Sequence, residues 1–352
     1  MRFQDPGVNF HNKDKATEGL TLFAPLRGNE AFLIDMDGNP VHSWKLKNGG
    51  INRCRLTDDG NLFICEDSGA GPKLSGGKAG LIREYDWDGN VVWEHHDDGQ
   101  HHDARRLPNG NTVYIGWELL SKEHQDRVQG GIEGSEHEDN GGIYGDYLRE
   151  IDAGGNTVWE WHFHDEDIEA FPLCPICSRH EFAHANTVSP LPNGDYMMSF
   201  RALNTLIIID RQTGKIRWSH RNLEFGHQHD CHMLPNGNVL VFCNGFHARD
   251  GDLCSKLMEF DPDTKETKWE YIANPPTSMY SGNISGMQRL WSGNTLICEG
   301  GKGCLTEITA DGEVVWEYVS PYETPHPKYG TINWVFRAYR YAPDAPELKG
   351  RV

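Results

Sequence analysis

The stretch FLIDMDGNPVHSW (residues 32–44) decides the fold, because it recurs along the chain. It consists of a short apolar run, an aspartate, a turn with glycine, and a second run that closes on Trp44. Five further copies end at Trp93, Trp159, Trp218, Trp269 and Trp316. Two strand-forming runs around a DG or TG turn are typical of a β-hairpin. The sequence therefore predicts one kind of hairpin, repeated six times.

A second hairpin unit lies between successive copies of the first. Its clearest form is ARRLPNGNTVYIG (residues 104–116), with Asn-Gly at the turn. Related copies cover residues 54–65, 188–200, 231–243 and 288–300, and we interpret NWVFRAYRYAPD (residues 333–344) as a degenerate sixth copy. Two hairpins per repeat make a four-stranded sheet, and six such sheets suit a propeller better than an open β-solenoid or a two-domain β-sandwich.

We therefore predict an all-β fold: a six-bladed β-propeller with four-stranded antiparallel blades around a central channel. Residues 1–352 are expected to form this single domain, with polar loop insertions at about 117–146 and 163–182. In a propeller, such loops are the usual place for function, because a rigid scaffold holds them near the channel.

Charge and composition exclude several classes of protein. Lys and Arg total 33 and Asp and Glu total 52, which gives a net charge of −19. So acidic a surface repels nucleic acid and anionic membranes, and we expect neither as a partner. The N-terminus shows no secretory signal and the chain has no run of about 18 apolar residues, so we expect a cytoplasmic protein with no membrane span. The nine cysteines are too few for a disulfide scaffold at this length.

Histidines gather just ahead of the PNG turns. His102 and His229 each lie six residues before the proline of their turn, and His184 and Asn186 lie at the corresponding place in the repeat between them. Residues that lead into equivalent strands of a propeller occupy equivalent positions around the axis, so we expect these side chains to converge on the channel. Strand alternation predicts that His102 and Ala104 point the same way.

At these residues the chain resembles the bacterial aryl sulfotransferases that use arylsulfate donors. The motifs that carry the resemblance are TLFAP with AFLIDMDGNPVHSW, HHDARRLPNGNTVYI, HANTVSPLPNGD and QHDCHMLPNGNVLVFCNG, and the similarity runs from about Gly19 to Ala342. Where the last motif ends VFCNG, the resemblance leads us to expect an acidic residue in place of Cys243.

The resemblance implies a six-bladed propeller and transfer of a sulfuryl group from an aryl sulfate to a phenol, by a ping-pong route through a sulfohistidine. It implies His229 as the nucleophile, His184 with Asn186 as the His-x-Asn pair, and His102 and Arg201 as further channel residues. We expect His184 to transfer protons, and His102 and Arg201 to orient and stabilise the anion. The resemblance also implies a reaction that is independent of the nucleotide donor PAPS and needs no cofactor. No GxxxxGK[ST] loop is present, so we do not expect a P-loop enzyme.

Three alternatives remain open from the residues themselves. The histidines could hold Zn or Cu in a metal-dependent hydrolase, lyase or oxidoreductase, with these candidate ligands: His102, His184, His227, His229 and His232. Cys174 and Cys177 form C-P-I-C, which with His180 and His184 could make a separate metal site in a loop. A non-enzymatic binding platform for a basic partner would leave the histidines incidental.

Overall fold

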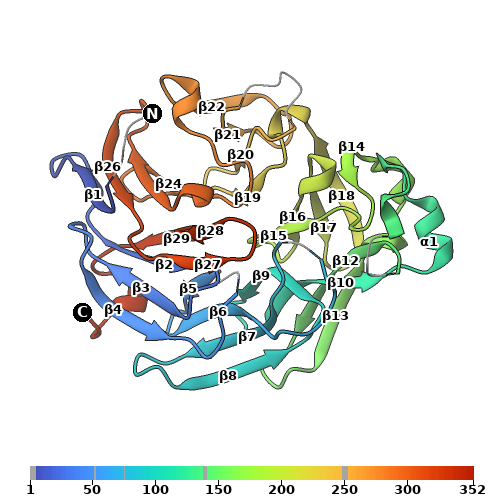
Figure 1. Ribbon diagram of the computed structural model, residues 1–352, viewed down its shortest axis with the longest axis horizontal. Coiled ribbons are helices and arrows are strands. Elements are labelled where there is room, and N and C mark those ends of the chain that lie inside the picture. Colours follow the sequence, from blue (N-terminus) through green and yellow to red (C-terminus); the bar gives the residue numbers. More distant parts are fainter. Residues whose placement is uncertain (1–4, 51–52, 75, 138–140, 248–252) are drawn as a thin grey trace.

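Strands are the main regular element of the computed structural model, which describes residues 5–50, 53–74, 76–137, 141–247 and 253–352 (Figure 1). Six antiparallel sheets surround a central axis, which confirms the predicted six-bladed β-propeller. The α-helix of the described part is α1 (Lys122–Arg127), and short 3₁₀ helices lie in the connections. No helix among these residues is long and apolar enough to cross a membrane.

The strands of each blade follow one another outward from the channel. In this order, blade 1 contains β29 (Val335–Tyr341), β2 (Leu20–Pro25), β3 (Glu30–Ile34) and β4 (Pro40–Lys45). Blade 2 contains β5 (Cys54–Leu56), β6 (Leu62–Asp67), β7 (Gly80–Tyr85) and β8 (Val91–His96). Blade 3 contains β9 (Gln100–Arg106), β10 (Thr112–Leu119), β12 (Tyr144–Ile151) and β13 (Thr157–His162).

The second half of the ring repeats this order. Blade 4 contains β15 (Ala185–Pro190), β16 (Tyr196–Phe200), β17 (Thr205–Asp210) and β18 (Lys215–Arg221). Blade 5 contains β19 (His229–Met233), β20 (Val239–Cys243), β21 (Lys256–Phe260) and β22 (Thr267–Ile272). Blade 6 contains β23 (Gly286–Arg289), β24 (Thr295–Glu299), β25 (Cys304–Ile308), β26 (Val314–Val319) and, at its outer edge, β1 (Gly7–His11).

The ring closes by pairing segments from opposite ends of the sequence. β29 pairs antiparallel with β2, with Tyr341 opposite Leu20, and β1 pairs with β26. The prediction of a sixth second-unit hairpin at residues 333–344 is therefore wrong, because this segment is one strand with no turn of its own. Its partner comes from β2, at the start of the chain.

Five of the six recurring tryptophans fasten a blade to the next one by a hydrogen bond. Trp316 of blade 6 donates its indole N–H to the backbone carbonyl of Met36 in blade 1 at 2.8 Å. Equivalent bonds to a turn of the following blade come from Trp44, Trp93, Trp218 and Trp269. Each such bond contributes about 1 kcal/mol net, and the indole also covers the joint between sheets. This interblade bond explains why the repeat ends on tryptophan.

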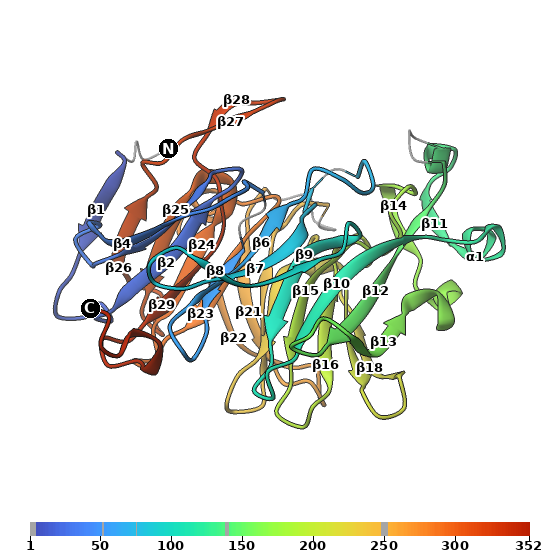
Figure 2. The same cartoon turned by 90° about the horizontal axis from the view of Figure 1, so that it is seen from below.

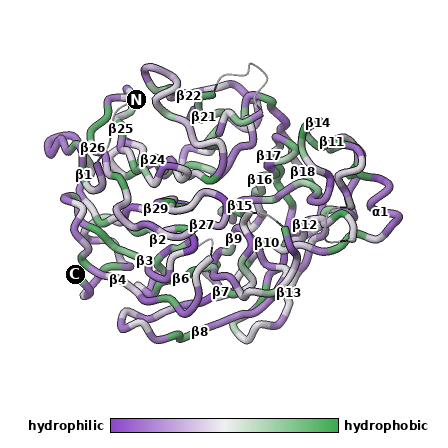
Figure 3. The backbone as a smooth tube through the Cα atoms, in the orientation of Figure 1, coloured by the Kyte–Doolittle hydropathy of each residue, from purple (hydrophilic) through white to green (hydrophobic). Residues whose placement is uncertain are grey.

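The hydrophobic core is a ring. Among the described residues, six clusters of buried apolar side chains lie one between each pair of neighbouring blades. Hydrophobic stretches follow the blades, whereas the segment around α1 is hydrophilic (Figure 3). Because each blade buries both of its faces, the scaffold holds the residues of the axis rigidly.

The two expected insertions differ at their edges from the prediction. β10 continues through Leu119 and β12 begins at Tyr144, so both ends of the 117–146 segment belong to paired strands. Within the insertions, β11 (Gly130–Ile132) pairs in parallel with β14 (Leu173–Ser178). Figure 2 shows β11 and β14 on the same face as the hairpin of β27 (Thr324–His326) and β28 (Gly330–Ile332).

Candidate active site

A cavity of about 980 Å³ opens on the face that carries β14 and the β27–β28 hairpin. Four of the five predicted catalytic side chains line it: His102, His184, Arg201 and His229. The fifth, Asn186, is fully buried behind the wall and does not line the cavity. Its amide donates to the backbone carbonyl of Gln228 at 2.8 Å, directly before His229, so Asn186 braces the strand that carries that histidine.

The innermost strands are bulged where they reach this cavity. His102, His184 and Asp230 have φ values of 51°, 53° and 53°, in the left-handed region. The strand pairing shifts register beside each of them. A bulge re-aims the side chains around it, so the expected alternation of His102 with Ala104 is wrong. His102 lines the cavity, whereas Ala104 packs in the apolar cluster between blades 2 and 3.

His229 presents a lone pair to the cavity. Its Nδ1 lies 2.8 Å from Oδ1 of Asn244 and 3.1 Å from the carbonyl of His227, and both of these atoms are acceptors. The amide of Asn244 is held in this orientation because its nitrogen donates to the carbonyl of Ser281 at 2.6 Å. Nδ1 therefore carries the proton and Nε2 does not. Burial, together with the positive charge of Arg201, lowers the pKa of His229 well below 6.5, so the ring is neutral at pH 7.

His184 is coupled to a buried carboxylate. Its Nδ1 lies 2.8 Å from Oε2 of Glu181, and Oε1 of Glu181 accepts from the indole of Trp117 at 3.0 Å. Burial raises the pKa of Glu181, but the neighbouring His184 outweighs this effect and the net pKa is lowered. Glu181 is therefore ionised, and it orients His184 with Nε2 free to carry a proton.

His102 ends a chain of polar contacts that runs behind the cavity. Its Nδ1 lies 2.7 Å from Nδ1 of His101, and Nε2 of His101 lies 3.1 Å from Asp146. The rings of His102 and His184 meet edge to face with centroids 4.7 Å apart. Burial lowers the pKa of His102 well below 6.5, and the nearby His184 adds to this effect.

Arg201 supplies positive charge to this cavity. It follows β16 directly, and its backbone N–H donates to the carbonyl of His184 at 3.0 Å. Within the described part of the chain, its guanidinium has no hydrogen-bond or ion-pair partner, and its closest aromatic contact is Phe246 at 5.9 Å. A planar guanidinium with free donors is suited to bind a tetrahedral oxyanion.

A buried ionic cluster closes the channel below the histidines. It consists of two aspartates and three arginines: Asp103, Asp230, Arg53, Arg105 and Arg337. Arg337 lies 2.7 Å from Asp230, and Arg53 pairs with Asp103. Burial raises the pKa of Asp230, but Arg337 outweighs it and holds the net pKa well below 3.8.

Beyond this cluster lies a second cavity of about 1070 Å³. Three innermost strands run from the first cavity, past the ionic cluster, to the second cavity. In this order, β9 carries His102, Asp103 and Arg105, and β19 carries His229, Asp230 and His232. β29 likewise carries Phe336, Arg337 and Tyr339. The two cavities share no lining residue among those described, so the ionic cluster separates them.

The five histidines that the metal-site hypothesis named as ligands do not lie at one place in the structure. His102, His184 and His229 line the first cavity, whereas His232 lines the second. Two groups of potential ligands have atoms that converge within 4.8 Å in the described ranges, and neither contains these four histidines. One group is Glu118, His162 and His164, and the other contains His227.

The CPIC cysteines have partners other than those expected. His180 and His184 do not join them, and the histidines beside Cys174 and Cys177 are His227 and His247, from blade 5. His180 instead hydrogen-bonds Ser178 at 2.6 Å. Spacing along the sequence favoured histidines close to the cysteines in the chain, whereas the closed ring places residues of blade 5 against the insertion that carries β14.

Sequence reasoning missed the residues that orient the histidines, namely Asn244, Glu181, His101 and Asp146. Asn244 directly follows Cys243, where the family resemblance suggested an acidic residue, and it supplies the acceptor that His229 needs. The sequence does mark the two aspartates of the ionic cluster, because each directly follows a cavity histidine in the motifs HHD and QHD. Asp103 and Asp230 both accept from a backbone N–H of the next blade, at Val188 and Met287.

Comparisons with known proteins bear on the chain as a whole. Two family models, each described as Arylsulfotransferase (ASST), match residues 8–225 and residues 134–321. A similarity search of curated proteins finds no match.

Solved structures share the fold. A protein of unknown function from Bacteroides caccae is 17% identical, with a TM-score of 0.58 over 92% of this chain and 99% of that chain. A streptogramin B lyase is 12% identical, with a TM-score of 0.52 over 92% and 86%. A virginiamycin B lyase from Staphylococcus aureus, crystallised with quinupristin, is 10% identical, with a TM-score of 0.50 over 90% and 89%. At these identities the likeness concerns the fold alone.

Proposed function

The chain belongs to the arylsulfotransferase family, and we propose that its histidine-lined cavity transfers a sulfuryl group from an aryl sulfate to a phenolic acceptor in two steps. The observation that carries this proposal is the buried, neutral His229, whose Nδ1–H is held by Asn244 and whose Nε2 is unprotonated beside Arg201. A nucleophilic nitrogen next to a guanidinium with free donors is what attack on a sulfate ester requires.

In the first step, Nε2 of His229 attacks the sulfur of the aryl sulfate. The N–S bond forms as the S–O bond to the aryl group breaks, and the electron pair of that bond leaves with the phenolate oxygen. Arg201 and an N–H of His102 donate to the sulfuryl oxygens, on which negative charge is spread. His184, protonated beside the ionised Glu181, gives its Nε2 proton to the phenolate, and a neutral phenol departs.

The second step reverses the first with a different phenol. His184, now neutral, takes the proton of the acceptor hydroxyl, and the acceptor oxygen attacks sulfur. The N–S bond breaks, its electron pair returns to Nε2, and the aryl sulfate of the acceptor is released. Both substrates are thus small aromatic molecules, and proton and electron balance needs no cofactor in this route.

Intact-protein mass spectrometry tests the covalent step. The protein is incubated with 4-nitrophenyl sulfate in the absence of acceptor, and released 4-nitrophenol is followed by absorbance. We expect one SO₃ adduct per chain together with one equivalent of phenol released. His229→Ala removes both, whereas His232→Ala, a change on the same strand that faces the other cavity, retains them.

Two results would contradict the proposal. One is normal turnover of donor and acceptor by His229→Ala. The other is consumption of the donor by the wild-type protein with no adduct at any time, because that outcome requires direct transfer or a different nucleophile.

A further inference from the structure

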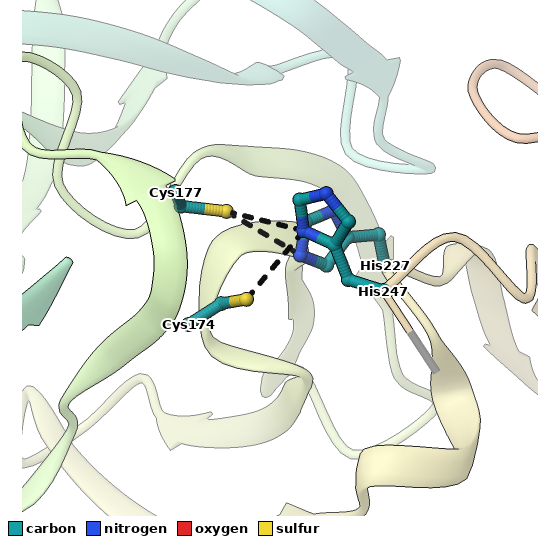
Figure 4. Close-up of side chains that lie close together, drawn as sticks. All are labelled: Cys174, Cys177, His227 and His247. Atoms are coloured by element: carbon teal, nitrogen blue, oxygen red, sulfur yellow. Dashed lines mark hydrogen bonds between the residues drawn. The ribbon is translucent and has the colours of Figure 1, made fainter. Parts of the chain in front are cut away.

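Four side chains with metal-binding atoms meet at the edge of the active-site cavity (Figure 4). We call them the Cys₂His₂ cluster, and its members are Cys174, Cys177, His227 and His247. The cysteines lie on β14, His227 precedes β19, and His247 follows β20. Three segments that are distant in sequence thus contribute two thiols and two imidazoles to one point.

The spacing within the cluster is that of a tetrahedral site. Sγ of Cys177 lies 3.5 Å from Nε2 of His227, and Nδ1 of His247 lies 3.5 Å from Sγ of Cys174 and 3.8 Å from Sγ of Cys177. For Zn–S and Zn–N bonds of about 2.3 and 2.05 Å, tetrahedral angles place sulfur and nitrogen about 3.6 Å apart. The three sulfur–nitrogen distances bracket this value, so an ion fits at the centre with little movement of the ligands.

We propose that the Cys₂His₂ cluster binds one Zn²⁺ as a closed structural site. Two thiolates and two neutral imidazoles around Zn²⁺ make a site with no net charge, which can be buried at low cost. Cys174 and His227 are buried, while Cys177 is half-buried at the cavity wall. The two thiol protons go to solvent when the metal binds, and no redox step is involved.

Such a site has a mechanical role at the active site. It would fasten the insertion that precedes blade 4 to blade 5, at the edge of the cavity. Cys177, Glu181 and His184 follow one another along this insertion, and the carbonyl of His227 accepts from Nδ1 of His229 at 3.1 Å. The metal would therefore fix the proton-transfer histidine relative to the nucleophile, without touching substrate.

Elemental analysis of the full chain tests the site without reference to activity. The protein is purified with a thiol reductant and no chelator, incubated with ZnSO₄ and passed through gel filtration. We expect about one zinc per chain in the wild type and a loss of about tenfold or more in Cys174→Ala/Cys177→Ala. Cys304→Ala, which removes a buried thiol on β25 in blade 6, keeps the metal.

A cobalt measurement keeps the test independent of how the variants fold. Co²⁺-loaded wild type is expected to show thiolate-to-cobalt charge-transfer bands and the intense visible bands of tetrahedral Co²⁺, and His247→Gln weakens the visible bands. The proposal is overturned if the wild type stays metal-free after incubation, if the double variant binds equal zinc, or if cobalt gives no thiolate band. A Cys174–Cys177 disulfide that persists under reductant would also overturn it.

Discussion

Acidification tests the burial of the two central imidazoles. His102 and His229 are 3% and 2% exposed, and burial lowers the pKa of both well below 6.5. In the unfolded chain each takes up a proton near pH 6.5, whereas in the folded protein it stays neutral. The unfolded state then binds more protons, so stability rises with pH in this range and falls on acidification.

The magnitude follows from linkage. Between about pH 7.5 and pH 5.5, an imidazole that titrates at about 6.5 only when unfolded costs the fold about 1.4 kcal/mol, so two cost about 3 kcal/mol. Other groups titrate as well; the pKa of His162, for example, is raised by Glu118, which gives a contribution of opposite sign. The measured quantity is therefore the difference between the wild type and His102→Asn/His229→Asn.

Urea unfolding followed by tryptophan fluorescence at the two pH values, at one ionic strength, gives this difference. We expect the double variant to lose about 3 kcal/mol less than the wild type on acidification. His96→Asn, at an exposed histidine on β8, should behave as the wild type does. Equal acid sensitivity of the wild type and the double variant would refute the reasoning, because the rings would then be protonated alike in both states.

Three further predictions concern the site and the ring. In Gly77→Ala the new Cβ would overlap the ring of His102, so we expect a cost of about 3 kcal/mol and at least a tenfold loss of kcat/KM with 4-nitrophenyl sulfate. Gly76→Ala, at the same sign of φ but with open space around it, should cost about 1 kcal/mol and spare the rate; a smaller effect at Gly77 than at Gly76 would contradict this. Trp316→Phe leaves the buried carbonyl of Met36 unpaired and should lower the free energy of unfolding in urea by about 2–4 kcal/mol. Trp93→Phe loses an exposed bond and should cost about 1 kcal/mol or less, so equal costs would argue against the interblade role. Arg201→Lys keeps the charge but loses the fork of donors, so kcat/KM for the aryl sulfate should fall about tenfold or more in steady-state assays, and an unchanged value would remove Arg201 from anion binding.

The fold was predictable because its determinants are local and repeated. Each hairpin carries its own turn residues and strand alternation, and the tryptophan at its end bonds the next blade. The closure was not predictable in detail, because the strand at residues 335–341 carries no turn signal and finds its partner about a whole chain length away. A single strand without a turn looks like any other apolar run.

The candidate site was predictable in its histidines but not in their supports. Counting back from the PNG turns placed His102 and His229 in one register, and both line the first cavity. The bulges at His102 and His184 were not predictable, since positive φ is uncommon at any residue other than glycine, even though histidine adopts it more often than most. Asn244, Glu181 and His247 come from loops and strand ends, whose position depends on how neighbouring blades meet.

Among the described residues, the ionic cluster separates the histidine-lined cavity from the second cavity, so substrates reach the histidines from the face that carries β14 and the β27–β28 hairpin. In the proposed two-step reaction, the phenol released from the donor leaves through the same face by which the acceptor phenol enters. The two aromatic molecules then compete for one compartment, and a high concentration of acceptor should slow the enzyme by occupying the pocket before the donor does. The closed axis of the propeller, rather than a moving lid, would then set the sequence in which donor and acceptor occupy the cavity.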